Sequence, residues 1–251
     1  HGDDRRQRQM CIRDREYRMG FEINDQVRSL NARLQHFMDE HIYPREREWH
    51  EWCHDREHLW EVPAWYDDIR DKAKAEGLWN LFLPEEYTPW SPGLTNVEIA
   101  PLFETMSKVM WAQSVFNCNA PDRGNMEVLA KYGTPEQQEQ WLKPLLAGEI
   151  RSAYAMTEPQ VASSDATNME LELRRDGDEY VLNGRKWWTT GAVGPRCKIM
   201  LVMGKSNPEN DRHRQHSTIL VPRDTLGVNQ TSSSLDVIIS LVGCGRREND
   251  A

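Results

Sequence analysis

The chain changes its hydrophobic pattern within residues 151–173, RSAYAMTEPQVASSDATNMELEL. Before this stretch, apolar residues recur every three to four positions, which is the spacing of one face of an α-helix. Within it, Met169, Leu171 and Leu173 alternate with polar residues, which is the period of a half-buried β-strand. The change predicts an α+β protein in which an N-terminal all-helical domain is followed by a sheet domain.

The first helix of the helical domain is predicted from a stripe of apolar residues that Pro44 interrupts. The stripe comprises Ile23, Val27, Leu30, Leu34, Phe37, Met38 and Ile42. Residues 1–20 have almost no apolar periodicity. They are therefore predicted to be a polar tail.

Later helices in this domain carry recognisable start and stop signals. A helix is predicted over 63–76 because Gly77 can end it, and the Thr95/Glu98 pair predicts a capping box. The run Gly133-Thr-Pro-Glu-Gln137 predicts the end of one helix and the capped start of the next. Residues 21–150 are therefore predicted to form the helical domain.

Residues 151–229 are predicted to form a small antiparallel β-barrel. The chain turns at 175–178, and Asn183-Gly184 is a strong signal for a further hairpin. Apolar runs at 199–203 and 217–221 predict two more strands. Because no helix is predicted between the strands, we expect neighbouring strands to run antiparallel.

Residues 230–251 match no motif and remain an unassigned tail. Within them, 235–242 is apolar enough to form one short element. The run Gly243-Cys-Gly245 resembles the opening of a dinucleotide-binding loop. It lacks the third glycine and a preceding βαβ unit, so we attribute it to chance.

The charge balance argues against binding to nucleic acid or to an anionic membrane surface. The chain has 251 residues, of which 40 are acidic and 31 are basic, giving a net charge of -9. Basic residues gather between Arg5 and Arg15 among acidic ones, and a solvated tail explains them better than a nucleic-acid arm does. No apolar run approaches the roughly 20 residues that span a bilayer.

Cysteine usage favours a reducing, intracellular compartment. The five cysteines are odd in number, far apart and include no CxxC pair, which is not the pattern of a disulfide framework. They are Cys11, Cys53, Cys118, Cys197 and Cys244.

Hydroxyl and aromatic side chains gather in two segments of the predicted sheet domain. The first is Tyr154-Ala-Met-Thr-Glu-Pro-Gln-Val-Ala-Ser-Ser-Asp165, and the second is Lys186-Trp-Trp-Thr-Thr-Gly191. Together they are suited to a large, flat cofactor with polar edges, because aromatic rings pack on a flat face and hydroxyls bond to its rim. Each segment alone can also be ordinary sheet sequence, since Tyr, Trp and Thr are common in strands.

Both segments resemble the flavin-binding signature of the acyl-CoA dehydrogenase family, and the first most resembles members 10 and 11 of that family. The resemblance covers roughly residues 21–229 and implies FAD as the cofactor. The first segment is one residue longer than the usual family pattern and has no glycine, which we interpret as a mark of this branch.

The resemblance assigns roles to individual residues. Tyr154, Met156, Thr157 and Ser164 match the family's first flavin segment, and Trp188 and Thr190 match the second. Thr157 can face the N5/O4 edge of the flavin, Ser163 and Ser164 can donate to phosphate, and Trp188 can lie against the ring. Ser164 also matches the family serine beside the CoA part of the substrate.

The activity implied by the resemblance is α,β-dehydrogenation of an acyl-CoA, with hydride transfer to FAD. Electron-transfer flavoprotein is the implied partner, fatty acid β-oxidation the implied process, and the mitochondrion or peroxisome the implied compartment. Family members form homo-oligomers. Their catalytic glutamate belongs to a C-terminal helical domain that we expect to be absent from this chain.

We assign no catalytic residue from the sequence. Glu158 and Asp165 lie near the expected flavin, but loop carboxylates usually cap or are solvated, so we favour neither as the base. The alternative function is therefore a catalytically silent binding or assembly protein. An oxidase or monooxygenase on the same fold is a further alternative.

A metal site is also disfavoured. His50, Cys53 or His54, and His58 fall about one helical turn apart and could line one face. The charged residues just before them favour a solvent-facing connector instead.

Overall fold

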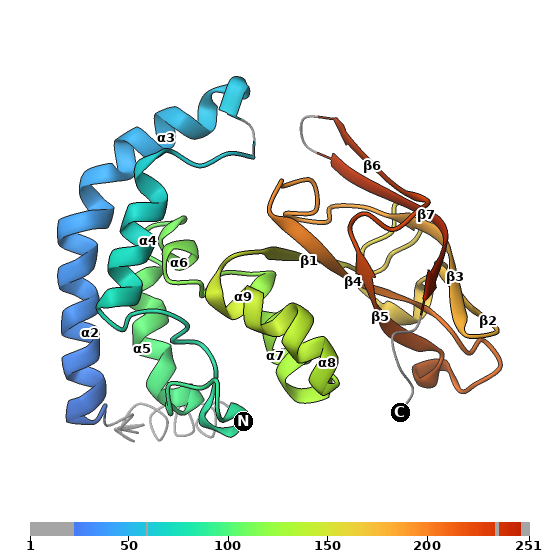
Figure 1. Cartoon of the computed structure of the whole chain (residues 1–251), viewed down its shortest axis with the longest axis horizontal. Coiled ribbons are helices and arrows are strands. Elements are labelled where there is room, and N and C mark those ends of the chain that lie inside the picture. Colours follow the sequence, from blue (N-terminus) through green and yellow to red (C-terminus); the bar gives the residue numbers. More distant parts are fainter. Residues whose placement is uncertain (1–22, 59, 234–235, 247–251) are drawn as a thin grey trace, which may run out of the picture.

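The computed structural model describes residues 23–58, 60–233 and 236–246 (Figure 1). The predicted polar tail, residues 1–20, lies outside this part. Helices precede strands along the chain, as the change of period predicts. No helix within the described ranges is long and apolar enough to span a membrane.

The α-helices are α2 (Asp25–Phe37), α3 (Glu46–His54), α4 (Trp65–Ala75), α5 (Asn96–Met106), α6 (Ala112–Val115), α7 (Asp122–Tyr132), α8 (Pro135–Gln137) and α9 (Lys143–Ala147). Two π-helical segments are η1 (Met38–Ile42) and η5 (Gln138–Leu142). The 3₁₀ turns are η2 (Tyr43–Arg45), η3 (Arg56–His58), η4 (Glu85–Tyr87), η6 (Ala166–Asn168) and η7 (Arg212–Arg214). The strands are β1 (Arg151–Ala155), β2 (Glu172–Asp176), β3 (Glu179–Lys186), β4 (Cys197–Lys205), β5 (His216–Pro222), β6 (Val228–Ser233) and β7 (Asp236–Arg246).

The capping signals of the helical domain are confirmed. The Thr95 hydroxyl accepts a hydrogen bond from the Glu98 amide while the Glu98 carboxylate accepts one from the Thr95 amide, which begins α5. Thr134 forms the same arrangement with Gln137 and begins α8. Gly77, with φ of +67°, follows the end of α4 in the left-handed region that glycine tolerates.

Pro44 interrupts the first helix only locally. It sits in the first turn of η2, where its missing N–H costs little, and the chain then continues into α3. The predicted connector after Pro44 is therefore helical. No residue of α3 is buried, so its predicted exposure is correct.

The helical core extends onto the sheet. Figure 1 shows α2 and α4 side by side, with the sheet at the other end of the molecule. Buried side chains of α2, α4, α5 and α7 belong to one cluster that includes Val27, Leu34, Phe37, Tyr66, Leu102 and Met126. Ile199 of β4 is also a member, so a strand of the sheet packs directly on the helices.

The prediction of an antiparallel barrel is wrong, because the sheet is mixed and open across the described residues. The strand order is β1-β4-β2-β3-β7-β6, and β5 pairs with β4. Strand β1 runs parallel to β4 and β2 meets β4 in a short parallel contact, while the remaining pairs are antiparallel. The β2–β3 hairpin lies between β1 and β4 in sequence, which lets those strands point the same way.

The run Ile199-Met-Leu-Val202 in β4 lies between a parallel and an antiparallel neighbour, β1 and β5. All four side chains are buried, so both faces of this strand are covered. Ile199 packs on the helical core. Met200 and Val202 belong to a second hydrophobic cluster, which is formed by residues of the sheet domain. Strands buried on both faces read as continuous apolar runs, and they are typical of parallel pairing.

The predicted turn at Asn183-Gly184 is also wrong. Both residues lie inside β3 and pair with Val242 and Leu241 of β7. A β-carbon at Gly184 would lie 2.8 Å from the Cα of Leu171, so glycine is required there by close packing rather than by a turn. The preceding turn is where it was predicted, with Gly177 at φ of +63° between β2 and β3.

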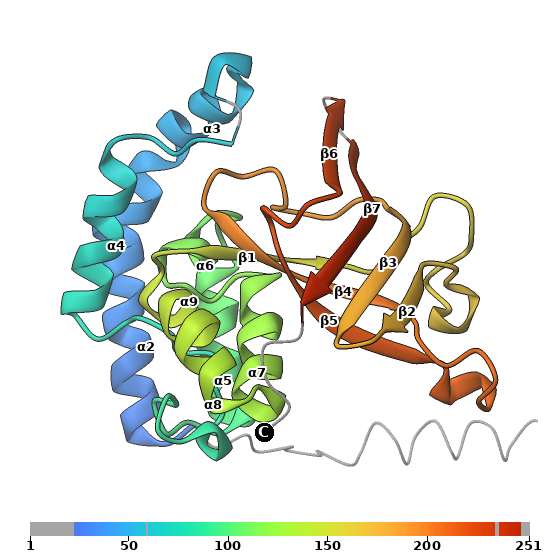
Figure 2. The same cartoon turned by 45° about the vertical axis from the view of Figure 1, so that its right-hand side comes forward.

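The segment left unassigned by the sequence contributes strands β6 and β7, which form a hairpin (Figure 2). Strand β7 pairs along β3 from Glu179 to Lys186. The glycines of the Gly243-Cys-Gly245 run therefore lie in a strand, which excludes the dinucleotide-binding loop.

Candidate functional site

The two segments expected to hold the cofactor meet in the fold. Strand β1 ends at Ala155 and β3 ends at Lys186. The backbone segments that follow these two strands are in contact. The Trp187 amide donates to the Thr157 carbonyl at 2.8 Å. The residues that follow each strand therefore lie together, although about thirty positions separate them in sequence.

Thr157, Ser164, Trp188 and Thr190 are exposed around this junction. Among the described residues, the hydroxyl groups of Thr157, Ser164 and Thr190 form no hydrogen bond with a side chain or backbone group. Trp188 leaves 56% of its surface exposed. These groups are free to meet a ligand that has both a flat face and a polar rim.

Trp188 and Thr190 do not lie on a strand. Strand β3 ends at Lys186, and Trp188 has φ of +56°, a conformation that residues other than glycine rarely adopt. Thr189 between them is buried, and its hydroxyl has no partner among the described residues. Trp188 and Thr190 nevertheless both face solvent.

The remaining predicted residues are less accessible. Ser163 is buried, and its hydroxyl oxygen accepts a hydrogen bond from the Glu158 amide at 2.9 Å. Of the two adjacent serines, only Ser164 is open to a ligand. Tyr154 is half-buried with its hydroxyl 3.8 Å from the Met203 sulfur, and Met156 is also half-buried.

Glu158 is not available as a base, because it forms a buried ion pair with Lys186. Lys186 is fully buried and Glu158 is 4% exposed, and the Lys186 Nζ and Glu158 Oε1 atoms are 2.8 Å apart. The Glu158 carboxylate also accepts hydrogen bonds from the amides of Glu170 at 2.7 Å and Leu171 at 2.9 Å. Burial lowers the pKa of the Lys186 ammonium, and the hydrogen bond with Glu158 opposes that shift.

The role of Lys186 was missed by sequence reasoning, which used it only to mark the start of the second segment. A signal was present, because Lys186 has the same parity as the buried Leu182 along β3. A lysine on the inward face of a strand requires a buried anionic partner. Sequence alone does not reveal which loop carboxylate supplies it.

Asp165 is also engaged. Its carboxylate accepts hydrogen bonds from the Thr167 hydroxyl and amide, and it pairs with Arg212 at 3.0 Å. The hydrogen bond from the Thr167 hydroxyl is the main reason that the pKa of Asp165 is lowered. A carboxylate held in its charged form in this way is a weak proton acceptor.

A buried carboxylate fixes β1 to the helical domain. Asp122 of α7 accepts hydrogen bonds from the Ser152 amide and hydroxyl, each at 2.6 Å. It also lies 2.5 Å from the Arg151 guanidinium, and the Asn125 side chain donates to the Ser152 hydroxyl. The strand that leads into the candidate site is therefore anchored to α7 at its start.

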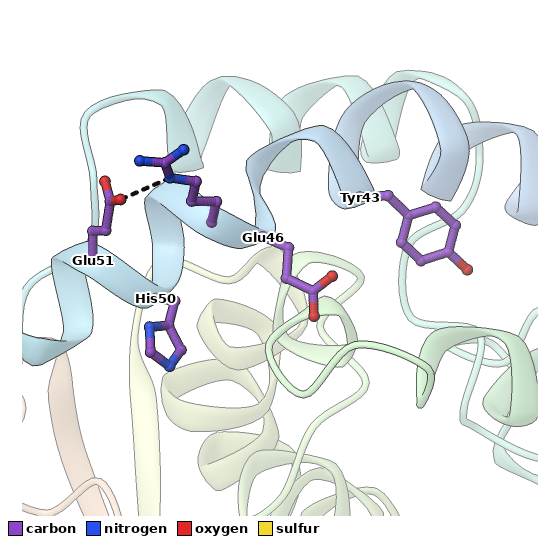
Figure 3. A pocket seen from close by; sticks show the side chains of 5 residues that line it. Tyr43, Glu46, His50 and Glu51 are labelled. Carbon is purple, nitrogen blue, oxygen red and sulfur yellow. Dashed lines mark hydrogen bonds and ion pairs between the residues drawn. The ribbon is translucent and has the colours of Figure 1, made fainter.

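The histidines around α3 stack on neighbouring rings. The His50 and His54 rings stack with centroids 4.1 Å apart, and the His58 ring stacks on Trp52 at 3.7 Å. Within the described ranges, no group of three or more His, Cys, Asp or Glu residues is arranged to hold a metal ion. Figure 3 shows His50 beside an open depression on this helix, lined by Tyr43, Glu46, Arg47, His50 and Glu51. None of the predicted cofactor residues lines that depression.

Comparisons with known proteins match both parts of the chain. The acyl-CoA dehydrogenase N-terminal domain model matches residues 24–149, and the middle domain model of the same family matches residues 153–237. Acyl-CoA dehydrogenase family member 10 of Mus musculus is 50% identical over 82% of this chain, and family member 11 of Homo sapiens is 50% identical over 78%.

Solved structures agree with the sequence comparisons. A Mycobacterium abscessus protein of the same family name superposes with a TM-score of 0.81 and 44% identity, over 88% of this chain. The chain spans 58% of that protein, and 20% and 25% of the mouse and human relatives. The two family models, the shared fold and the 50% identity lead to one conclusion: the chain belongs to the acyl-CoA dehydrogenase family.

Proposed function

We propose that the chain binds FAD at the junction of its two segments and serves the α,β-dehydrogenation of an acyl-CoA. The observation that carries this proposal is the exposure of Thr157, Ser164, Trp188 and Thr190 around the backbone link between Trp187 and Thr157. Family membership supports the reaction class.

The exposed residues fit the chemical needs of a flavin. Trp188 would pack against the isoalloxazine ring, and Thr157 and Thr190 would donate hydrogen bonds to its polar edge. Ser164 would bind phosphate or the CoA part of the substrate. When bound, FAD supplies an acceptor for the hydride that leaves the β-carbon of the acyl group.

The chain's own residues would orient the reactants and exclude water. An aromatic side chain that covers the ring removes solvent, which strengthens the hydrogen bonds from nearby hydroxyls. Electrons would leave to electron-transfer flavoprotein, in a mitochondrial or peroxisomal compartment. We also propose that copies of this chain assemble into a homo-oligomer.

A second candidate is a binding or assembly protein without dehydrogenase activity. It is favoured by one observation, which is that both carboxylates of the first segment have other roles. Glu158 is paired with Lys186, and Asp165 with Arg212. Neither is free to take the α-proton of a substrate.

Fluorescence titration of the purified chain with FAD tests cofactor binding. Trp188→Ala should raise the Kd by roughly 2- to 13-fold, since an aromatic contact contributes roughly 0.5–1.5 kcal/mol beyond its buried area. Trp60→Ala is the matched control, because Trp60 is also exposed and also has a positive φ. Equal Kd values for both variants, or no FAD uptake by the unaltered chain, would refute the proposed site.

Anaerobic mixing with acyl-CoAs of different chain length separates the two candidates. A dehydrogenase bleaches its bound flavin when a substrate is added. Bound FAD that no acyl-CoA reduces would support the binding or assembly protein instead.

A further inference from the structure

The buried Glu158–Lys186 pair adjoins, along the chain, both segments of the proposed FAD site. The neighbours of Glu158 in sequence include the exposed Thr157, and Lys186 precedes the segment with the exposed Trp188. The pair itself is sealed from solvent, since Lys186 is 0% and Glu158 4% exposed. It cannot touch a ligand, so any influence on FAD must pass through the backbone.

The pair connects three backbone segments beside the site. Lys186 Nζ donates to the Met156 carbonyl at 2.9 Å as well as to Glu158. The Glu158 carboxylate holds the amides of Glu170 and Leu171, which lead into β2. One ion pair therefore joins the end of β1, the approach to β2 and the end of β3.

Two further hydrogen bonds extend this arrangement to the ligand-facing residues. The Glu158 amide donates to the Ser163 hydroxyl, which fixes the loop one residue before the exposed Ser164. The Trp187 amide donates to the Thr157 carbonyl, which fixes the backbone one residue before Trp188. The positions of the exposed groups thus depend on atoms that the pair holds.

The position of Trp188 shows why such support is needed. Its φ of +56° is unfavourable for a residue with a β-carbon, and it persists only where the surroundings impose it. The hydrogen bonds at Lys186 and Trp187 restrain the backbone immediately before it. A ligand site held in this way is formed before the ligand arrives.

We propose that Glu158 and Lys186 are positioning residues that preset the two FAD-binding segments relative to each other. This inference rests on the proposed function. Its experiment therefore needs a readout that does not require FAD, as well as one that does.

The first readout is hydrogen exchange of the chain without FAD. Lys186→Met should speed exchange at the amides of Trp187, Glu170 and Leu171 more than elsewhere. Leu34→Ala, a buried change in the helical domain, controls for general loss of stability. If Lys186→Met and Leu34→Ala both speed amide exchange uniformly along the chain, the proposal is wrong.

The second readout is FAD affinity, together with the visible circular dichroism of the bound flavin. Lys186→Met should weaken FAD binding by roughly 10- to 100-fold, as loss of a residue that orients a binding group typically does. Leu34→Ala should leave the Kd and the flavin spectrum of its folded fraction unchanged. Equal affinity in Lys186→Met and the unaltered chain would overturn the proposal.

The double variant Glu158→Gln/Lys186→Met guards against a single variant that does not fold. It leaves no buried charge, so it should fold better than Lys186→Met and still bind FAD weakly. Normal FAD binding by the double variant would overturn the positioning role. Failure of the unaltered chain to bind FAD would instead refute the proposed function and this role in it. The hydrogen-exchange rates at Trp187, Glu170 and Leu171 would still show whether the pair fixes the two segments.

Discussion

Replacing Lys186 with methionine should destabilise the fold severely. The change leaves the Glu158 carboxylate 4% exposed and without its cation, and it removes the hydrogen bond to the Met156 carbonyl. Breaking one side of a buried ion pair typically costs about 3–5 kcal/mol. Since domains are stable by only about 5–15 kcal/mol, this loss is a large fraction of the total.

Urea unfolding followed by far-UV circular dichroism measures the effect. The double variant Glu158→Gln/Lys186→Met should recover most of the lost stability, because removing both charges removes the cost of burying one alone. Lys72→Met on the exposed face of α4 should change the free energy of unfolding by less than about 0.5 kcal/mol. If Lys186→Met is no more destabilising than Lys72→Met, the buried ion pair is not formed as described.

Three further outcomes are expected. Alkylation followed by peptide mass spectrometry should label the exposed Cys53 well before Cys118, because complete burial raises the pKa of the Cys118 thiol to about 12; equal labelling rates would contradict this. Gly184→Ala should cost about 1–3 kcal/mol in urea unfolding, since its β-carbon would meet Leu171, and an unchanged midpoint would exclude that contact. Burial lowers the pKa of His216 below its unfolded value of about 6.5. The stability that neutral His216 contributes is therefore present above that pH and is lost as the pH falls. His216→Phe should flatten the pH dependence of the free energy of unfolding, and an unaltered profile would count against the shift.

Local signals in the sequence predicted the helical domain well. The capping pairs at Thr95 and Thr134 and the stop at Gly77 depend only on residues close in sequence, and the structure confirms all of them. The sheet was harder because its pairing is not local. The Asn183-Gly184 pair has the composition of a turn, but contact with the distant Leu171 is what requires the glycine.

The parallel pairing of β1 and β4 could not be predicted from the absence of helices between strands. The helical domain covers β4, so Ile199 is buried on one face while Met200 is buried on the other. The continuous apolar run was the available signal. Segments after residue 229 lacked alternation, so their pairing with β3 was not foreseen.

Prediction of the candidate site was strongest for residues that face outward. Thr157, Ser164, Trp188 and Thr190 were recognised from their chemistry and lie exposed at one junction. The supporting residue Lys186 escaped notice because its partner, Glu158, is distant in sequence. Long-range pairs of this kind become visible only when the fold brings two loops together.

The structure of the chain crystallised with FAD tests the central claim most directly. The account predicts flavin density at the junction of the two segments, with the ring against Trp188 and its polar edge within hydrogen-bonding distance of Thr157 or Thr190. Flavin bound elsewhere, for example in the depression beside His50, would contradict the account. Crystals grown in saturating FAD that show no flavin density at the junction would also contradict the account.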